Sequence, residues 1–316
     1  MPKNSVSEWS TTAASNTDVG GVDLGENTMR PRDVNNAIRT MMAQIKTVLG
    51  GNTTTREKLT AARTYYVRTD GSNSNTGLAN TSGGAFLTAQ KAMDVIADTL
   101  DIGNYDVTVS IGDGTYTGTL RLKTFIGSAG RVKFVGNTTT PANVLFSTTS
   151  TTAVATNDNG VAGVFELRGF KVQTTTSGDG INISAPRAIV YIGNIDFGAC
   201  AGTQMNASFG SLVYYLASLA VSGNAVLGFV ADREATMFLS AGTIVYSNSP
   251  VYSARNFQFS GGGTLDVYSM TFTNGGTVTG KRYEGDGLGR CFTNGGGASY
   301  VPGNSAGSVA NGAVYY

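Results

Sequence analysis

The sequence predicts an all-β protein, built as a parallel β-helix behind a short N-terminal segment that is helical and irregular. Three observations carry this prediction: the composition, an internal repeat of about 25 residues, and strand-like alternation inside each repeat. Only 14% of the 316 residues are charged, although 41% are hydrophobic, so a disordered chain is not expected. The 43 glycines and the many Ser, Thr and Asn residues indicate frequent turns between short strands.

The charge balance and the missing residue types exclude several classes of function. A net charge of +1 gives no overall field for nucleic acid or an anionic membrane, so neither is expected as a partner. No apolar run reaches the roughly 18 residues of a membrane span, and the first residues lack the apolar core of a signal peptide. The chain has no histidine, which excludes Ser-His-Asp and Cys-His catalysis and a zinc site built from histidines.

Metal and disulfide chemistry are not expected either. Cys200 and Cys291 are too few for a disulfide framework and are expected to be small buried thiols rather than a bridge or metal site. The loops IGDG (111–114) and SGDG (177–180) each offer a single acid, which is too few for a calcium site. No metal and no cofactor is therefore predicted.

The first part of the chain, up to about residue 30, is polar and irregular. It contains Trp9, the only tryptophan, and few other apolar residues. So small an apolar set cannot build an independent core, so we expect the segment to order against a neighbouring chain or another protein. A loose tail with one incidental tryptophan is the alternative.

Residues 33–49 are predicted to form a helix with a heptad pattern. Asp33 is a good N-cap, and Gly50 and Gly51 are expected to end the helix. The apolar residues that alternate at spacings of four and three are Val34, Ile38, Met41, Ile45 and Val48. β-branched residues at these positions favour a three-stranded coiled coil, but the helix is too short to be stable alone. The alternative is an amphipathic helix that packs on its own chain.

Residues 61–104 are predicted to open the β-helix and to cap its N-terminal end. A short strand at 65–68 precedes a long Gly/Asn/Ser loop and a helix at 87–100, which is expected to bury Leu87 and Ile96. Such a helix would cover the open edge of the first coil.

Residues 105–290 are predicted to be the shaft of the β-helix. Inside this range, successive segments align with a period of 24 to 27 residues. The matching inward positions are Phe165, Val190, Tyr214, Phe238 and Leu265, and the second strands begin at Phe170, Ile195, Leu219, Thr243 and Met270. The segments lack the repeated Leu and Asn positions of leucine-rich repeats, and propeller blades need about 40 residues, so a parallel β-helix remains.

Three parts of the chain resemble tail fibre and tailspike proteins of tailed bacteriophages. The N-terminal stretch NSVSEWSTTAASNTDVGG, followed by DVNNAIRTMMAQIKTVLG, is similar to the opening of many such proteins. The stretch YYVRTDGSNSNTG…GGAFLTAQKAMDVI resembles the first coil of pectate-lyase-like tail proteins. The Gly- and Tyr-rich residues 291–316 are similar to the close of prophage tail proteins.

This resemblance implies a right-handed, pectate-lyase-like β-helix in a homotrimer. It further implies that residues 1–60 anchor the chain, through Trp9 among others, to tail, portal or adaptor proteins of the virion. The shaft would then bind polysaccharide on the host surface, and the protein would be found in the virion tail and outside the cell after lysis. Many members of the family cleave glycans, but many do not.

One outward column of the repeat is a candidate for recognition. Since Phe165 and Leu167 are expected to point inward, Glu166 points outward. The column is predicted to run through Glu166, Tyr191, Tyr215, Leu239 and Asp266. Its two acids lie four rungs apart, roughly 19 Å at the strand spacing, which is too far for a catalytic pair. The adjacent tyrosines suit either a sugar platform or the interface of the trimer.

Catalysis has one local candidate, the pair Asp232 and Glu234. Two carboxylates two residues apart lie about 6–7 Å from each other along an extended chain, which suits inverting glycoside hydrolysis. A solvated corner is the alternative for this pair and for the similar pair Glu284 and Asp286. Asp196 is expected one rung from Lys171, as a surface ion pair.

Three functions compete at this stage. The first is a binding spike without catalysis, which the low charge and the absence of histidine favour. The second is a glycan depolymerase with its site at Asp232 and Glu234 or between chains. The third is a structural adaptor or decoration protein of the virion that never contacts a receptor.

Overall fold

The computed structural model describes residues 4–10, 15–24, 30–52, 56–156 and 160–316. The chain divides into two compact units, Met1–Arg56 and Glu57–Tyr316. The division lies four residues before the predicted boundary at residue 60. Each unit is described by itself below.

The N-terminal unit holds a short 3-10 turn, a hairpin and one long helix. These elements are η1 (Val6–Glu8), β1 (Asp18–Val19), β2 (Val22–Asp23) and α1 (Pro31–Asn52). The turn and the hairpin pack on one side of α1, where Ala37 and Gln44 are buried. The helix begins two residues before the predicted start and continues through Gly50 and Gly51, so the prediction that these glycines end it was wrong.

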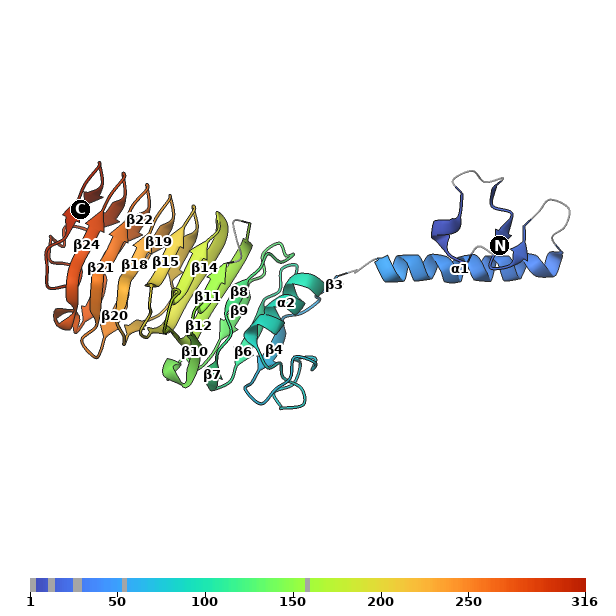
Figure 1. Cartoon of the computed structure of the whole chain (residues 1–316), viewed down its shortest axis with the longest axis horizontal. Helices are drawn as coiled ribbons and strands as arrows, with labels where there is room; N and C mark the ends of the chain where they lie inside the picture. Colours follow the sequence, from blue (N-terminus) through green and yellow to red (C-terminus); the bar gives the residue numbers. More distant parts are fainter. Residues whose placement is uncertain (1–3, 11–14, 25–29, 53–55, 157–159) are drawn as a thin grey trace. The chain divides into compact units, whose positions relative to one another are not determined.

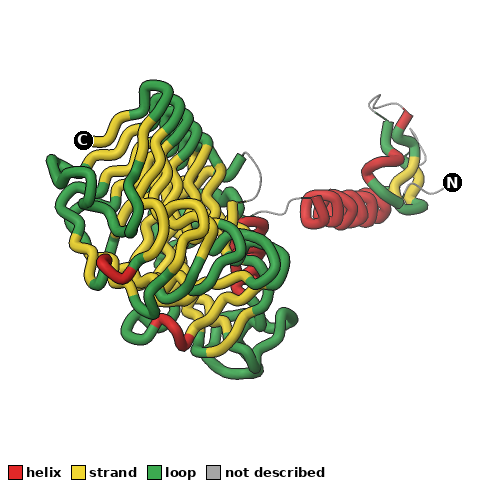
Figure 2. Tube along the Cα trace, turned by 60° about the vertical axis from the view of Figure 1, so that its left-hand side comes forward, coloured by secondary structure: helices red, strands yellow, loops and turns green. Residues whose placement is uncertain are grey.

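The second unit is a parallel β-helix, as the repeat predicted. Figure 1 shows its strands stacked side by side from green to red, and Figure 2 shows the connecting loops along the edges of the stack. Each coil contributes strands to three faces, which we call A, B and C in chain order. Faces A and B form one 15-stranded sheet, and face C is a separate 8-stranded sheet.

The strands of the three faces are as follows. Face A holds β4 (Arg63–Val67), β6 (Val107–Ile111), β9 (Val132–Val135), the first halves of β12 (Ala162–Thr174) and β14 (Arg187–Phe197), β16 (Leu212–Tyr215), β19 (Thr236–Phe238), β22 (Thr264–Asp266), β25 (Arg290–Phe292) and β27 (Val314–Tyr315). Face B holds β7 (Gly114–Tyr116), β10 (Val144–Thr148), the second halves of β12 and β14, β17 (Leu219–Val221), β20 (Thr243–Tyr246) and β23 (Thr271–Thr273). Face C holds β8 (Leu120–Leu122), β11 (Val154–Thr156), β13 (Ile181–Ser184), β15 (Thr203–Ser208), β18 (Ala225–Ala231), β21 (Val251–Phe259), β24 (Thr279–Gly285) and β26 (Ser308–Val309).

The interior of the β-helix is filled by like residues stacked from coil to coil. Phe229 lies between Phe197 and Phe257, with ring centroids 5.5 and 5.4 Å apart, and all three side chains are fully buried. Both cysteines are free and buried, as predicted, and burial raises the pKa of the Cys200 thiol to about 12. Because every second residue of a strand points inward, burying these positions fixes the alternation seen in the sequence.

A helix caps the N-terminal end of the β-helix. This helix, α2 (Ala89–Thr99), packs against β4, β6, β8 and the short β5 (Leu100–Asp101), which pairs with β3 (Glu57–Lys58). The Thr88 side chain accepts the Lys91 backbone N–H as N-cap. Ile96 is buried as predicted, but Leu87 lies before the helix and is 40% exposed, so its predicted burial was wrong.

The last residues continue the β-helix. β26 pairs in parallel with β24, and β27 pairs in parallel with β25. Residues 291–316, predicted as a tail beyond the shaft, therefore supply its last strands on faces C and A. The remaining elements, η3 (Pro141–Asn143) and η4 (Gly275–Thr277), are single turns in connections.

Candidate functional site

The outward column of face A differs from the predicted one at two rungs. Tyr191 pairs with Tyr214, and Tyr214 pairs with Phe238, so Tyr215 and Leu239 do not belong to the column. The column runs through Lys133, Glu166, Tyr191, Tyr214, Phe238, Asp266 and Phe292. Glu166 and Asp266 lie four rungs apart, as expected.

The error has a local cause in the corner before β16. Ile183 pairs with Ala207 on face C, but Ile189 pairs with Leu212 on face A, so this corner is one residue shorter than the one before it. Tyr214 and Tyr215 are both aromatic, so either phase of the strand was acceptable from the sequence. The second strands shift similarly, since Leu219 pairs with Ile244 rather than Thr243, and Ile244 with Phe272 rather than Met270.

Three rings form a stacked ladder on the outside of face A. Tyr191 and Tyr214 have centroids 5.2 Å apart at 21°, and Tyr214 and Phe238 have centroids 4.9 Å apart at 11°. The Arg131 guanidinium lies over the Tyr191 ring, 4.4 Å from its centroid. Tyr215 instead packs partly buried against the core, and its hydroxyl accepts the Thr243 backbone N–H at 2.9 Å.

The positions beside the ladder are also uncharged. On the same three strands, Ile189, Leu212 and Thr236 occupy the neighbouring outward position and are half-buried. Farther along face A, Phe292 and Tyr316 stack with centroids 5.3 Å apart, and both are exposed. We call the outward surface of face A from β14 to β27 the ladder face.

Face C carries a different outward surface. One outward column reads Asn182, Asn206, Val230, Gln258, Glu284 and Ser308. The column at its edge reads Ser184, Ser208, Asp232, Ser260 and Asp286, in which the Ser184 and Ser208 hydroxyls bond to each other and the Ser260 hydroxyl donates to Asp232. Amide, hydroxyl and carboxylate groups thus recur on almost every coil.

The predicted catalytic pair lies at the corner between faces C and A. Arg233 and Glu234 are exposed, and with Phe209, Gly210, Pro186 and Gly261 they line an open pocket of about 730 Å³. The Arg233 guanidinium lies 4.6 Å from the centroid of the Phe209 ring.

The two carboxylates of the pair have different surroundings. Asp232 is half-buried, accepts the Ser260 hydroxyl at 2.7 Å, and lies 3.4 Å from the Arg233 Nε. Glu234 makes no hydrogen bond or ion pair through its carboxylate with the residues that the structure describes. Arg233 and Glu234 therefore line the pocket, whereas Asp232 does not line it and contacts Ser260 and Arg233 instead. A role of the two carboxylates in cleavage stays a prediction.

The corner also holds backbone conformations that most residues avoid. The corner turns between faces C and A contain two successive left-handed residues, at Phe209–Gly210, Arg233–Glu234, Gly261–Gly262, Gly287–Leu288 and Asn311–Gly312. Glycine fills many of these positions because it has no Cβ to clash. In the coil of Arg233 (φ 48°) and Glu234 (φ 65°), both of these positions carry long charged side chains.

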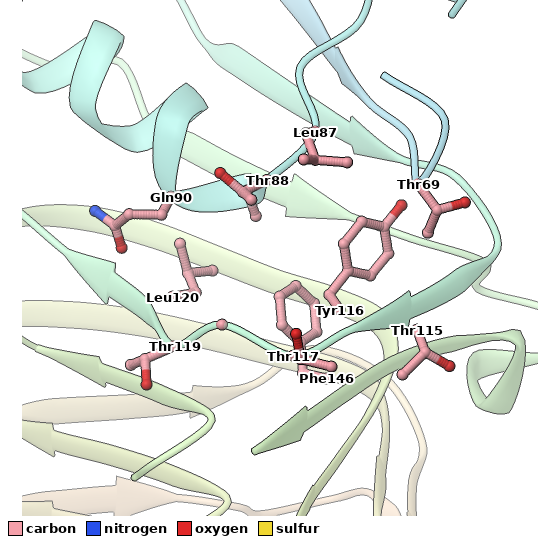
Figure 3. A pocket seen from close by; sticks show the side chains of 12 residues that line it. Thr69, Leu87, Thr88, Gln90, Thr115, Tyr116, Thr117, Thr119, Leu120 and Phe146 are labelled. Atoms are coloured by element: carbon pink, nitrogen blue, oxygen red, sulfur yellow. The ribbon is translucent and has the colours of Figure 1, made fainter. Parts of the chain in front are cut away.

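A second pocket lies beside the N-terminal end of α2. It measures about 210 Å³, and Figure 3 shows the Tyr116 and Phe146 rings at its centre, between Thr88 and Gln90 on one side and Thr115 on the other. Burial raises the pKa of the Tyr116 hydroxyl to about 12, and this hydroxyl donates to the Gly112 carbonyl. The pocket is smaller than the roughly 300–1,000 Å³ of ordinary ligand sites.

Two other predicted acids, Asp196 and Glu284, are held in ion pairs. Lys171 and Asp196 are paired across adjacent rungs at 3.2 Å, as predicted, and Lys171 also donates to the Ser222 hydroxyl. Asp196 is only 8% exposed, so this pair is not the surface pair that the sequence suggested. Glu284 is bound by Lys281 and Arg255, and the Lys281 hydrogen bond holds the pKa of its carboxyl below the ordinary value.

In the N-terminal unit, the heptad stripe of α1 lies away from the side that the hairpin covers. Val34, Ile38 and Ile45 are 43%, 46% and 40% exposed, and Met41 is half-buried. The Val48 side chain lies outside the described part. Trp9 is half-buried, and its indole N–H is buried without an acceptor among the described residues.

The acids and helices of the described part bear on metal and membrane binding. In the described ranges, no three or more His, Cys, Asp or Glu side chains are grouped so as to hold a metal ion. The acids of the two Gly-Asp loops instead hold turns, since Asp179 accepts the Thr203 backbone N–H and Asp113 accepts the amides of Asn137 and Asn143. Among the helices of the described part, none is long and apolar enough to cross a membrane.

Several residues at these sites escaped the sequence prediction. Tyr214, Phe238 and Arg131 of the ladder were hidden by the register, and Phe209 lies on the coil before Arg233. Only the position of the left-handed turns, marked by the glycine pairs in later coils, could have pointed to the corner. A search of family models, of curated proteins and of solved structures finds no match for this chain.

Proposed function

We propose that the chain is the subunit of a homotrimeric tail fibre or tailspike of a tailed bacteriophage. In this proposal, the N-terminal unit attaches the trimer to tail, portal or adaptor proteins of the virion. The β-helix then binds polysaccharide on the surface of the host cell. The resemblance of residues 4–49 and 65–96 to such proteins gives the viral context.

The outward chemistry of face C carries the polysaccharide part of this proposal. A glycan presents hydroxyls on every sugar, and it is bound by side chains that both donate and accept hydrogen bonds. Asn182 and Asn206 supply such groups one coil apart, about 4.8 Å, and Gln258 supplies another two coils farther along the face, beyond Val230. The corner pocket adds a guanidinium, a carboxylate and an exposed phenyl ring at the side of this row.

The trimer part of the proposal is supported by α1. A stripe of Val34, Ile38 and Ile45 exposed to water is costly unless a partner covers it. A heptad stripe fits most closely the same stripe on a parallel copy of the helix, and β-branched residues at both positions favour three strands.

Binding of the purified full chain to an array of bacterial capsular polysaccharides and lipopolysaccharides tests the proposal. We expect retention of at least one polysaccharide, and at least a tenfold weaker affinity when Arg233→Ala and Glu234→Ala are combined. The matched control combines Lys91→Ala and Asp98→Ala on α2, which removes the same two charges away from the pocket.

Three results would count against this function. No binding to any bacterial polysaccharide, together with incorporation into particles, would favour a structural adaptor. Release of oligosaccharides that stops in Asp232→Asn or Glu234→Gln would make the protein a depolymerase instead. Absence of the protein from purified phage particles, by antibody labelling in electron micrographs, would remove the viral context.

A further inference from the structure

The rings of the ladder have little free face for a ligand to stack on. Tyr214 is covered on one face by Tyr191 and on the other by Phe238, at centroid distances of 5.2 and 4.9 Å. The outer face of Tyr191 is covered by the Arg131 guanidinium. A sugar platform needs exposed ring faces, because sugars stack their C–H groups on the face of an aromatic ring. This ladder presents mainly ring edges to solvent.

The surroundings of the ladder are equally poor in groups that bind sugars. Ile189 and Leu212 flank it together with Thr236, and the exposed side chain of Leu216 follows on the next outward position. Over the three aliphatic side chains, glycan hydroxyls would lose water without gaining a hydrogen-bond partner, which costs free energy. Ring edges and branched aliphatic side chains instead fit another apolar protein surface.

We propose that the ladder face is the surface on which a second copy of this chain docks, parallel and side by side, so that like coils meet. This inference rests on the homotrimer proposed above, and it assigns the sugar site to face C rather than face A. It also decides between the two roles, sugar platform and chain interface, that the tyrosine column allowed.

A second copy is the occupant that the rest of the chain favours. Each copy carries two uncovered apolar surfaces, the α1 stripe in one unit and the ladder face in the other. An unrelated partner protein would need two separate surfaces complementary to these, whereas a second copy of this chain carries the same two apolar surfaces.

The size of the ladder face agrees with a weak interface that a second contact supports. Six strands with at most two outward positions on the short strands, at about 4.8 Å between strands and about 3.3 Å per residue, cover roughly 400 Å². Two copies would bury roughly 800 Å², which is below the size of stable specific interfaces, so this contact alone would be weak. The α1 stripe would add to this area and raise the local concentration of the second contact.

The charges at the C-terminal end of the ladder face are complementary. Asp266 and Arg290 stand on the neighbouring strands β22 and β25, and neither forms an ion pair with the described residues. When a second copy lies beside the first in parallel, Arg290 of the second copy would lie within one strand spacing of Asp266 of the first. No two carboxylates need to meet, because the three coils before Asp266 are uncharged at the ladder and beside it.

Cross-linking of single-cysteine variants of the full chain tests the inference. Thr236→Cys places a thiol beside the ladder with little change in size, and Asn206→Cys places one at a half-buried outward position of face C. The native Cys200 and Cys291 are buried, so the unmodified chain reports the background. We expect a short bis-maleimide to join copies through Thr236→Cys at least tenfold more than through Asn206→Cys.

Each other outcome overturns the inference in a distinguishable way. An oligomer by light scattering that cross-links through neither thiol, or through Asn206→Cys, would refute the ladder interface and leave the homotrimer standing. A monomer at every concentration would refute both. Protection of the Thr236→Cys thiol by host polysaccharide, but not of the Asn206→Cys thiol, would make the ladder the sugar site. Circular dichroism of each variant confirms that the β-helix is folded.

Discussion

Faces A and C of the β-helix have a similar apolar interior but differ in most of the side chains that they show to water. On both faces, every second residue is apolar and buried, as in β6 on face A and β8 on face C. Outside, face A carries stacked rings and aliphatic side chains, whereas face C carries amides, hydroxyls and carboxylates. The fold constrains mainly the inward positions, so the outward ones are free to differ, and the two faces carry opposite chemistry there.

The corner between these faces is distinguished by its left-handed backbone conformation. Its left-handed turns suit glycine, yet one coil has Arg233 and Glu234 there. A non-glycine residue in this conformation costs about 1–2 kcal/mol. Strained residues are frequent at functional sites, where the function of the side chain offsets the stability that is lost. This agrees with a binding role for the pocket that these two residues line.

The largest expected effect comes from the interior that both faces share. Phe229→Ala should lower the free energy of unfolding by about 3–5 kcal/mol, because the ring is fully buried between Phe197 and Phe257. Urea unfolding followed by circular dichroism measures this loss. Val226→Ala, on the same strand but 41% exposed, should cost less than about 0.5 kcal/mol. Equal losses in the two variants would contradict the assignment of inward and outward positions.

Replacing rings of the ladder on face A by amides, as on face C, should weaken the oligomer. The double variant Tyr214→Asn, Phe238→Gln should raise the dissociation constant of the oligomer at least about tenfold, or about 1.4 kcal/mol, since the ladder rings are lost. Light scattering over a dilution series measures it. The reverse change, Asn206→Tyr on face C, should leave the dissociation constant unaltered. An equal effect from both variants would mean that the oligomer does not use face A.

Relieving the corner should stabilise the chain while weakening the proposed sugar site. Glu234→Gly should raise the free energy of unfolding by about 0.5–1 kcal/mol, since glycine removes the left-handed strain but adds freedom to the unfolded chain. Thermal melting measures it, together with affinity for polysaccharide. Thr236→Gly, two residues later in a strand, should destabilise instead. A lower melting temperature for Glu234→Gly would show that strain is not what distinguishes this coil.

The smallest expected effect concerns the ion pairs of face C. Lys281 and Arg255 lower the pKa of Glu284 in the folded chain, so this carboxylate contributes stability above its ordinary pKa of about 4.5. That contribution is lost as the pH falls through the folded pKa. Glu284→Gln should therefore reduce the fall in melting temperature below about pH 4.5, and only slightly, because the side chain is partly exposed. Melting temperatures of the two proteins across this range of pH measure the difference, and an equal fall in both would contradict this contribution.

The sequence predicted the fold much better than it predicted the column of outward residues. The period and the inward residues Phe165, Val190 and Leu265 were right, because burial imposes them on each coil separately. Tyr215 was placed in the column wrongly, because a corner one residue shorter moved the phase of β16. The predicted burial of Leu87 and the predicted end of α1 at Gly50 and Gly51 were also wrong, because the end of a helix is only loosely set by its local sequence.

The candidate site was only partly within reach of the sequence. Asp232, Arg233 and Glu234 were singled out by their density of charge. The structure places Arg233 and Glu234 at a pocket that Phe209 also lines, and leaves Asp232 out of its lining. The heptad stripe of α1 was visible in the spacing, but its exposure was not. The pocket beside Tyr116 joins residues from 69 to 146, which no local pattern connects.

The sequence by itself determined that this chain forms a β-helix with a capping helix and a separate helical N-terminal unit. These features follow from alternation, repeat length and composition, which act locally along the chain. Only the tertiary structure decided which outward residues meet, because one residue more or less in a corner turns a strand's side chains to the opposite face. The rings of Tyr191, Tyr214 and Phe238 stack because the lengths of the corners pair these residues on three successive strands.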